Sequence, residues 1–230
     1  MSAMQFEPNL QDLSKMTPTR LSVGQESPSD ENVDPRFLAD AEKSRADTYR
    51  VLARLFREAP DAELLRILSD CCKHDADRSD LTSAWDDLAA VSRGADAGSL
   101  DREFHALFIG LGRGEVLPYA SWYLSGFLSD KPLARLRSDL NALGIERADD
   151  VSESEDHFAA LCETMALLVD TTAGIDLAGQ KKFFERHLQP WVFQFFGDVQ
   201  AARNVNYYRH VSTLAQRFFE FEKSWLSLPQ

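Results

Sequence analysis

Apolar residues recur along this chain at intervals of three and four, and no stretch keeps the strict alternation of a half-buried strand. The clearest stripe is the last one, formed by Tyr207, Val211, Leu214, Phe218, Phe221 and Trp225. Such intervals place side chains on one face of a helix. The sequence therefore predicts an all-α, single-domain helical bundle of about eight to eleven helices.

Cap and break residues divide the chain into these helices. Asp61 and Ser99 are expected to cap helices, and Asp130 with Pro132 to begin another. Gly144 is expected to end that helix in the left-handed conformation. Residues 1–34 contain prolines and many polar residues without a helical period. They are predicted to be a disordered tail, and residues 35–230 the folded domain.

The charge balance narrows the class of partner. The chain has 37 acidic and 25 basic residues and a net charge of −12, which argues against nucleic acid and favours a basic partner. No run approaches the ~20 apolar residues that cross a bilayer, and the first ten residues lack the pattern of a signal peptide. Two of the three cysteines are adjacent, which suits a reducing compartment. We expect a cytoplasmic protein without stable membrane insertion.

Aromatic residues gather in the stretch from Pro118 to Leu124. Three of five consecutive positions are Tyr119, Trp122 and Tyr123. Tyrosine and tryptophan join an apolar body to a polar group, which suits binding sites, although buried aromatics are also ordinary core residues.

A second, mostly polar stretch runs from Glu153 to His157, directly before the stripe of Phe158, Leu161, Met165 and Leu168. Ser152 with Glu155 has the spacing of a capping box, and Glu153 is almost as good a cap. Either start predicts that Asp156 and His157 lie in the first helical turn, with Glu153 on the same face as His157.

Catalytic and metal sites are less well supported than peptide binding. The five histidines are scattered, and no serine or cysteine lies in a recognisable nucleophile motif, so we expect no enzyme. Cys71, Cys72 and His74 are too few and too close for a structural zinc site, and the cysteines are expected to be buried. The glycine-rich segment Gly110–Gly114 lacks the Lys-Ser/Thr of a phosphate loop and is expected to be a connector.

Together these stretches resemble the TorD/DmsD family of redox-enzyme maturation chaperones. The family's aromatic-x-x-x-aromatic-Leu motif corresponds to residues 119–124. Its Glu-Pro-x-Asp-His motif corresponds to residues 153–157, with Ser154 in place of the proline. The likeness extends over about Asp34 to Leu228 and includes residues 46–56, 104–110 and 184–191.

The resemblance implies a chaperone that binds the twin-arginine signal peptide and the apo form of an exported molybdoenzyme catalytic subunit, a reductase or a dehydrogenase. It implies that the chaperone assists cofactor insertion and delays export until folding is complete. Some members form domain-swapped dimers, so a homodimer is open. Guanine-nucleotide binding is not carried over, because the chain has no nucleotide motif, and no cofactor of its own is expected.

A receptor for such a leader needs carboxylates for the arginines and an apolar or aromatic surface for the segment that follows them. The expected peptide-binding residues are Tyr119, Ser121, Trp122, Tyr123, Leu124, Phe127, Glu153, Asp156 and His157. The alternative is a helical metal- or cofactor-binding protein, or an enzyme, that uses Glu153, His157 and the cysteines.

Overall fold

The computed structural model describes residues 35–71, 79–147, 152–170 and 175–228. Within these ranges it contains ten α-helices, one π-helical turn and no β-strand, which confirms the all-α prediction. The predicted tail, Cys72 and His74 lie outside the described residues. No helix in the described ranges is both long and apolar enough to cross a membrane.

Helices make up most of the described residues. In chain order they are α2 (Pro35–Arg57), α3 (Ala62–Asp70), α4 (Asp80–Ser92), α5 (Ala97–Phe104), the π-helical turn η1 (His105–Ile109), α6 (Ala120–Ser125), α7 (Lys131–Ala142), α8 (Phe158–Val169), α9 (Leu177–His187), α10 (Val192–Ala201) and α11 (Tyr207–Trp225).

Local cap chemistry explains several of these boundaries. Asp61 accepts a hydrogen bond from the Leu64 N–H at 2.8 Å, and Gly144 follows α7 with a left-handed φ of 71°, both as predicted. The prediction that Ser99 caps α5 is wrong. The cap is Asp96, whose Oδ2 accepts from the Ser99 N–H at 2.9 Å and from its hydroxyl at 2.8 Å.

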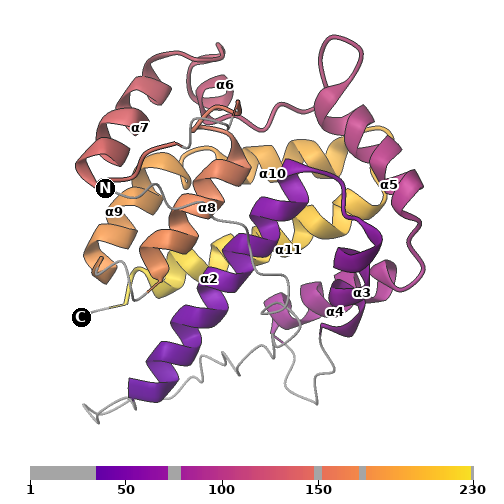
Figure 1. The fold of residues 1–230 in the computed structure, drawn as a ribbon, viewed down its shortest axis with the longest axis horizontal. Coiled ribbons are helices and arrows are strands. Elements are labelled where there is room, and N and C mark those ends of the chain that lie inside the picture. The colour runs from indigo at the N-terminus through magenta and orange to yellow at the C-terminus, as the bar shows by residue number, and fades with distance from the viewer. Residues whose placement is uncertain (1–34, 72–78, 148–151, 171–174, 229–230) are drawn as a thin grey trace.

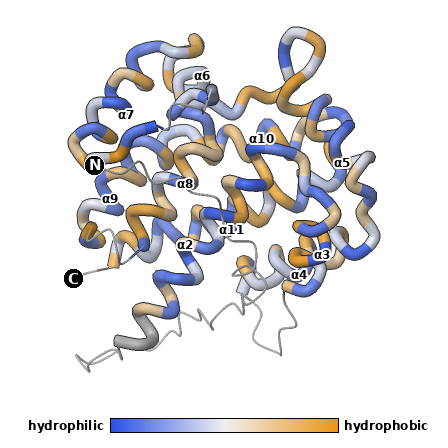
Figure 2. Tube along the Cα trace, in the orientation of Figure 1, coloured by the Kyte–Doolittle hydropathy of each residue, from blue (hydrophilic) through white to orange (hydrophobic). Residues whose placement is uncertain are grey.

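Helices α2, α8 and α11 form the centre of the bundle. α2 packs along α8, while α11 packs against α4 and α10. The helices α7 and α9 lie at one end of the molecule and α3, α4 and α5 at the other (Figure 1). Hydrophobic and hydrophilic residues alternate along the helices at short intervals (Figure 2). The apolar faces meet around Phe158 of α8, whose ring lies 4.9 Å from that of Phe56 and 5.7 Å from that of Phe219.

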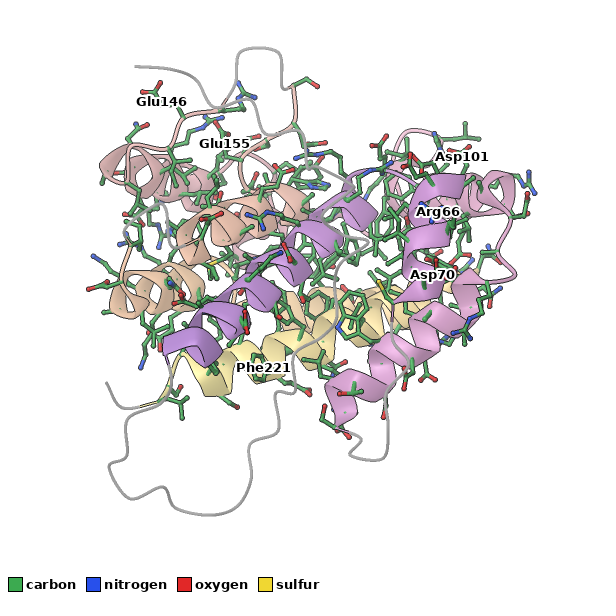
Figure 3. All side chains as sticks on the ribbon, turned by 60° about the horizontal axis from the view of Figure 1, so that its bottom comes forward. Arg66, Asp70, Asp101, Glu146, Glu155 and Phe221 are labelled. Atoms are coloured by element: carbon green, nitrogen blue, oxygen red, sulfur yellow. The ribbon has the colours of Figure 1, made fainter. Side chains whose placement is uncertain are left out.

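A charged pair is buried inside this core. Arg45 on α2 donates to Glu222 on α11 at 2.6 Å and 2.9 Å, and neither side chain is exposed. Tyr49 also donates to Glu222, at 3.0 Å. Many other charged residues lie outside, such as Arg66, Asp70 and Asp101 at one end of the bundle and Glu146 near the other (Figure 3).

Candidate functional site

The aromatic and polar stretches meet in an isolated antiparallel β-bridge between Tyr119 and His157. The Ala120 N–H donates to the Asp156 carbonyl at 2.9 Å, and the Phe158 N–H donates to the Pro118 carbonyl at 2.8 Å. Residues opposite each other between two such bonds bring their side chains close together. The Tyr119 and His157 rings accordingly lie edge to face, 5.0 Å apart.

This bridge overturns the predicted start of the following helix. Residues 153–157 are not helical, and α8 begins at Phe158, with His157 as its N-cap. Neither the proposed capping box nor a cap at Glu153 exists, because the backbone of residues 156–158 bonds to residues 118–120 instead. His157 caps α8 through Nδ1, which accepts from the Ala159 N–H at 3.1 Å.

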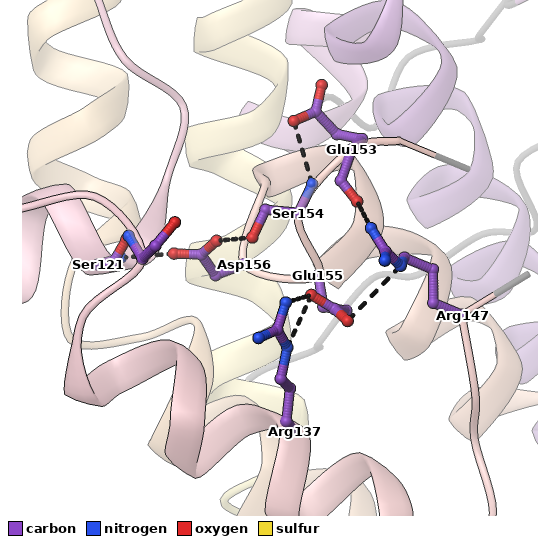
Figure 4. A network of polar contacts seen from close by, with 8 residues as sticks. Ser121, Arg137, Arg147, Glu153, Ser154, Glu155 and Asp156 are labelled. Atoms are coloured by element: carbon purple, nitrogen blue, oxygen red, sulfur yellow. Dashed lines mark hydrogen bonds and ion pairs between the residues drawn. The ribbon is translucent and has the colours of Figure 1, made fainter. Parts of the chain in front are cut away.

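Asp156 is buried and both of its carboxylate oxygens are bonded. One oxygen accepts from the Ser121 N–H at 2.9 Å and the other from the Ser154 hydroxyl at 2.6 Å (Figure 4). The Ser121 N–H belongs to the first turn of α6, which has no side-chain cap from its own N-cap residue, Tyr119. Asp156 therefore caps α6 from a segment 35 residues away.

Glu153 also contacts the aromatic segment. Its Oε1 accepts from the Tyr119 hydroxyl at 2.7 Å and from the Ser154 N–H at 3.2 Å. Burial, and then the bond to Glu153, raise the pKa of Tyr119, so this phenol stays protonated and donates. Glu153 and His157 thus converge on Tyr119, although they do not share a helix face.

Glu155 is held by two arginines. Arg137 of α7 donates to one carboxylate oxygen at 3.1 Å and 2.9 Å, and Arg147 lies 3.7 Å from the other (Figure 4). Arg147 also donates to the backbone carbonyl of Glu153 at 3.1 Å. Burial acts to raise the pKa of Glu155, but the bond to Arg137 and the two positive charges lower it overall. Glu155 is therefore a carboxylate at neutral pH.

His157 is neutral at the same pH. Burial lowers its pKa to about 4, and the charge of Arg57 acts in the same direction. The carboxylates of Glu153 and Asp156 act to raise this pKa but are outweighed. A neutral ring that accepts at Nδ1 carries its proton on Nε2.

Ser121 and Tyr123 attach α6 to its surroundings. The buried Ser121 hydroxyl accepts from the Ser129 N–H at 3.2 Å, which folds the loop after α6 back onto the helix. The Tyr123 ring stacks on Trp191 at 5.4 Å, and its hydroxyl donates to Asp198 at 2.9 Å. These contacts hold α6 against α10.

The remaining candidate side chains, Trp122, Leu124 and Phe127, are half-buried or exposed. Trp122 is half-buried, and the Arg113 guanidinium lies 4.3 Å from the centre of its ring. Within the described residues, five of the six exposed large apolar side chains lie between positions 109 and 128. We call these five the apolar surface: Ile109 (52% exposed), Leu111 (107%), Leu124 (41%), Phe127 (71%) and Leu128 (50%).

The glycine-rich segment contains Leu111 and lies between Ile109 and the start of α6. It follows the π-helical turn, and the next helix begins only at Ala120, so neither structural context of a phosphate loop is present. A Cβ on Gly114 would lie 2.4 Å from the Phe108 carbonyl carbon. The Val116 N–H then donates to the Leu107 carbonyl at 2.8 Å. The backbone of this segment therefore lies directly against η1.

Nothing in the described ranges groups three or more residues as metal ligands. Cys71 and Cys162 are buried and free, and burial raises the pKa of both thiols, that of Cys71 to about 11. His187 is buried and bonded to Asp139 at 2.7 Å, as expected of a structural residue, whereas His105 is exposed rather than part of the core. The described hollows around Lys181 on α9 and between α10 and α11 involve none of the candidate residues.

The candidate residues therefore form one region, with different exposures. Tyr119, Ser121, Glu153, Asp156 and His157 make the joint between the two stretches, and Trp122, Tyr123, Leu124 and Phe127 lie on α6 and the loop that follows it. The peptide-binding residues expected from the sequence did not include Ile109, Leu111, Leu128, Arg113, Arg137 and Arg147. Leu128 could have been included from the sequence, because it directly follows the apolar candidate Phe127.

Comparison with known proteins identifies the family of this chain. The sequence profile of the nitrate reductase delta subunit family matches residues 74–197, more than half of the chain, and includes both stretches of the bridge. The chaperone protein TorD of Vibrio cholerae serotype O1 (strain ATCC 39541) is 30% identical over 136 residues, which cover 55% of this chain and 62% of the relative. TorD of Aliivibrio fischeri is 27% identical over 151 residues, covering 61% of this chain and 70% of the relative. The chain thus spans somewhat less than two thirds of the Vibrio cholerae relative.

A solved structure shows the same fold. It is described as a redox enzyme maturation protein from Archaeoglobus fulgidus, and it superposes with a TM-score of 0.51 at 17% sequence identity. The match covers 78% of this chain and 93% of that protein.

Proposed function

We propose that this chain, which belongs to the nitrate reductase delta subunit family, is a TorD-type maturation chaperone for an exported molybdoenzyme. It binds the twin-arginine signal peptide and the apo form of the catalytic subunit, a reductase or a dehydrogenase. By holding the leader it assists cofactor insertion and delays export until folding is complete. It works in the cytoplasm as a monomer or a homodimer, through the domain of residues 35–230.

One observation carries this proposal: the exposed apolar side chains fall in one stretch of the chain, residues 109–128, and the Tyr119–His157 bridge ties this stretch to the acidic loop of residues 152–157. Exposed apolar groups on a protein mark binding surfaces when they cluster, and here nearly all of those in the described chain fall within one stretch. A twin-arginine leader has a basic pair followed by an apolar segment. The basic pair suits the acidic loop, and the apolar segment suits the apolar surface.

The apolar surface receives the apolar segment of the leader. Phe127 and Leu128 project from the loop after α6, and Leu124 lies on α6 itself. Trp122 is half-buried beside them. Removing these side chains from water on binding supplies the main favourable free energy.

The acidic loop receives the basic pair. Glu153 and Glu155 are partly accessible carboxylates, and a guanidinium donates to a carboxylate with two parallel N–H groups. The net charge of −12 attracts a cationic leader from a distance, which raises the association rate more than the final affinity.

Three buried candidates and the half-buried Tyr123 support this surface from below. Asp156, His157, Ser121 and Tyr123 are bonded within the protein and set the positions of α6 and the acidic loop. Tyr119 links these residues to the acidic loop, because its hydroxyl donates to Glu153 and orients it. We therefore expect substitutions of these residues to reduce binding through the shape of the site.

The test compares two exposed leucines. Leu128→Ser, alone and with Phe127→Ser, is expected to weaken binding of the client's leader peptide by about tenfold or more, because each removes apolar contact area from the site. Leu228→Ser is the matched control, since Leu228 is 52% exposed, as Leu128 is 50%, but lies beyond the end of α11. Isothermal titration calorimetry measures all three affinities. Equal affinities for the Leu128 and Leu228 variants would contradict the proposal.

A further inference from the structure

Three of the chain's own arginines lie on the groups of the candidate site that suit a guanidinium. Arg137 and Arg147 contact the Glu155 carboxylate, and Arg113 lies over the Trp122 ring (Figure 4 shows the first two). We call Arg113, Arg137 and Arg147 the arginine cover. A carboxylate and an aromatic face are the two kinds of group that bind guanidinium best.

The three contacts come from separate parts of the chain. Arg137 lies on α7, Arg147 follows α7, and Arg113 lies in the glycine-rich segment after η1. A carboxylate contact and a ring contact are different interactions, and arginine makes both of them here.

The contacts of the arginine cover are exchangeable. The Arg137 and Arg147 side chains are 52% and 41% exposed, whereas the Glu155 side chain is 15% exposed. Exposed ion pairs contribute little net free energy, because water and salt compete for both partners. Another guanidinium can therefore replace either arginine on Glu155 without leaving a buried charge unpaired.

We propose that the arginine cover is an intramolecular substitute for the arginine pair of the leader. In the free chaperone it occupies Glu155 and Trp122, and a bound leader displaces it and takes over these contacts. This inference rests on the proposed function.

The exchange predicts that a leader with paired arginines binds more tightly than one without them. A leader with two guanidinium groups can place one on Glu155 and one on Trp122, so it restores an interaction on each group that the cover leaves, and the apolar surface supplies most of the affinity. A peptide without guanidinium groups displaces the cover and restores none of its interactions. Discrimination therefore comes from the interactions that the wrong partner breaks and does not replace.

The experiment removes the two arginines on Glu155. The probes are a synthetic leader peptide in which an Arg-Arg pair precedes a Leu- and Ala-rich segment, and the same peptide with Gln-Gln. The double variant Arg137→Gln/Arg147→Gln is expected to bind the Arg-Arg peptide about threefold to tenfold more tightly than the wild type, because the internal competitor is gone. Arg135→Gln is the control for charge, since it removes a positive charge from the exposed face of the same helix.

The outcomes separate this inference from the function on which it rests. A wild type that prefers Arg-Arg to Gln-Gln, together with a double variant no tighter than Arg135→Gln, would overturn the arginine cover alone. A wild type that binds neither peptide, and no leader of its client, would overturn the function. Nuclear magnetic resonance of the wild type gives a second readout that needs no variant. The Arg137 Nε–H signal is expected to shift to a solvent-exposed position when the Arg-Arg peptide is added, and an unchanged signal at saturation would contradict displacement.

Discussion

Asp156 links the two halves of the candidate site. Its side chain is almost completely buried, it caps α6, and its backbone carbonyl forms part of the bridge to Ala120. A carboxylate at a helix N-terminus satisfies N–H groups that otherwise lack a partner. The shape of the site therefore depends on a residue that a ligand is not expected to touch.

Substitution of Asp156 tests this role. Asp156→Ala leaves the Ser121 N–H and the Ser154 hydroxyl without their acceptor, and is expected to lower the free energy of unfolding by about 1–3 kcal/mol. Glu146→Gln is the control, because Glu146 is an exposed carboxylate near the same loop. Urea denaturation followed by circular dichroism measures both. A loss no larger than that of the control would show that the cap contributes nothing.

His157 makes stability depend on pH. Its folded pKa of about 4 lies below the ~6.5 of an unfolded histidine, so the unfolded chain binds the extra proton between these values. Its stabilising contribution is complete above about pH 6.5 and is lost as the pH falls toward about 4, by up to about 3 kcal/mol. His157→Asn keeps a cap acceptor and removes the titration. We expect the variant to lose less stability than the wild type between pH 7 and pH 4, and parallel pH profiles would be evidence against this.

At the scale of single elements, the glycine-rich segment is held tightly against η1. A methyl group on Gly114 would collide with backbone atoms of Phe108, whereas one on Gly197, inside α10, would meet nothing within 4 Å. Gly114→Ala is expected to lower the free energy of unfolding by about 1–3 kcal/mol through overpacking. Gly197→Ala is expected to raise it by about 0.5–1 kcal/mol through helix propensity. Thermal unfolding measures both, and effects of the same sign would contradict this description of the segment.

Elements whose signals are local were predictable from the sequence. The apolar stripe of residues 207–225 became α11, and Asp130, Pro132 and Gly144 marked the ends of α7. The start of α8 was predicted wrongly, and α6 was not predicted as a helix. Both depend on bonds between residues 118–121 and 156–158, and pairing across such a separation leaves no local pattern.

At the scale of the molecule, the ends of the described chain are joined by the buried pair of Arg45 and Glu222. Glu222→Leu leaves the Arg45 guanidinium buried without its carboxylate and is expected to cost about 3–5 kcal/mol of stability. The double variant Arg45→Met/Glu222→Leu removes both charges and is expected to cost much less. Glu220→Gln, on the surface of the same helix, is expected to change little. Unfolding by denaturant measures the stability of the wild type and the three variants. A double variant as unstable as Glu222→Leu would refute the argument.

The sequence motifs also identified the family, since the TorD/DmsD resemblance is confirmed by the profile match and the TorD relatives. They identified which residues come together, because Tyr119, Ser121, Glu153, Asp156 and His157 do meet. They did not indicate which of these are buried, or that Arg137 and Arg147 cover Glu155. Those features depend on how α7 packs beside the acidic loop, which residue spacing alone does not specify.

The most direct test of the proposed function is affinity purification of the tagged chaperone from cells that make its molybdoenzyme client, followed by mass spectrometry. We expect the co-purifying protein to be a molybdoenzyme catalytic subunit that lacks its cofactor and still carries a leader with paired arginines. We expect the Phe127→Ser/Leu128→Ser variant to recover much less of it than Leu228→Ser does. Equal recovery with both variants, or of a subunit whose leader has been deleted, would contradict leader binding at this surface.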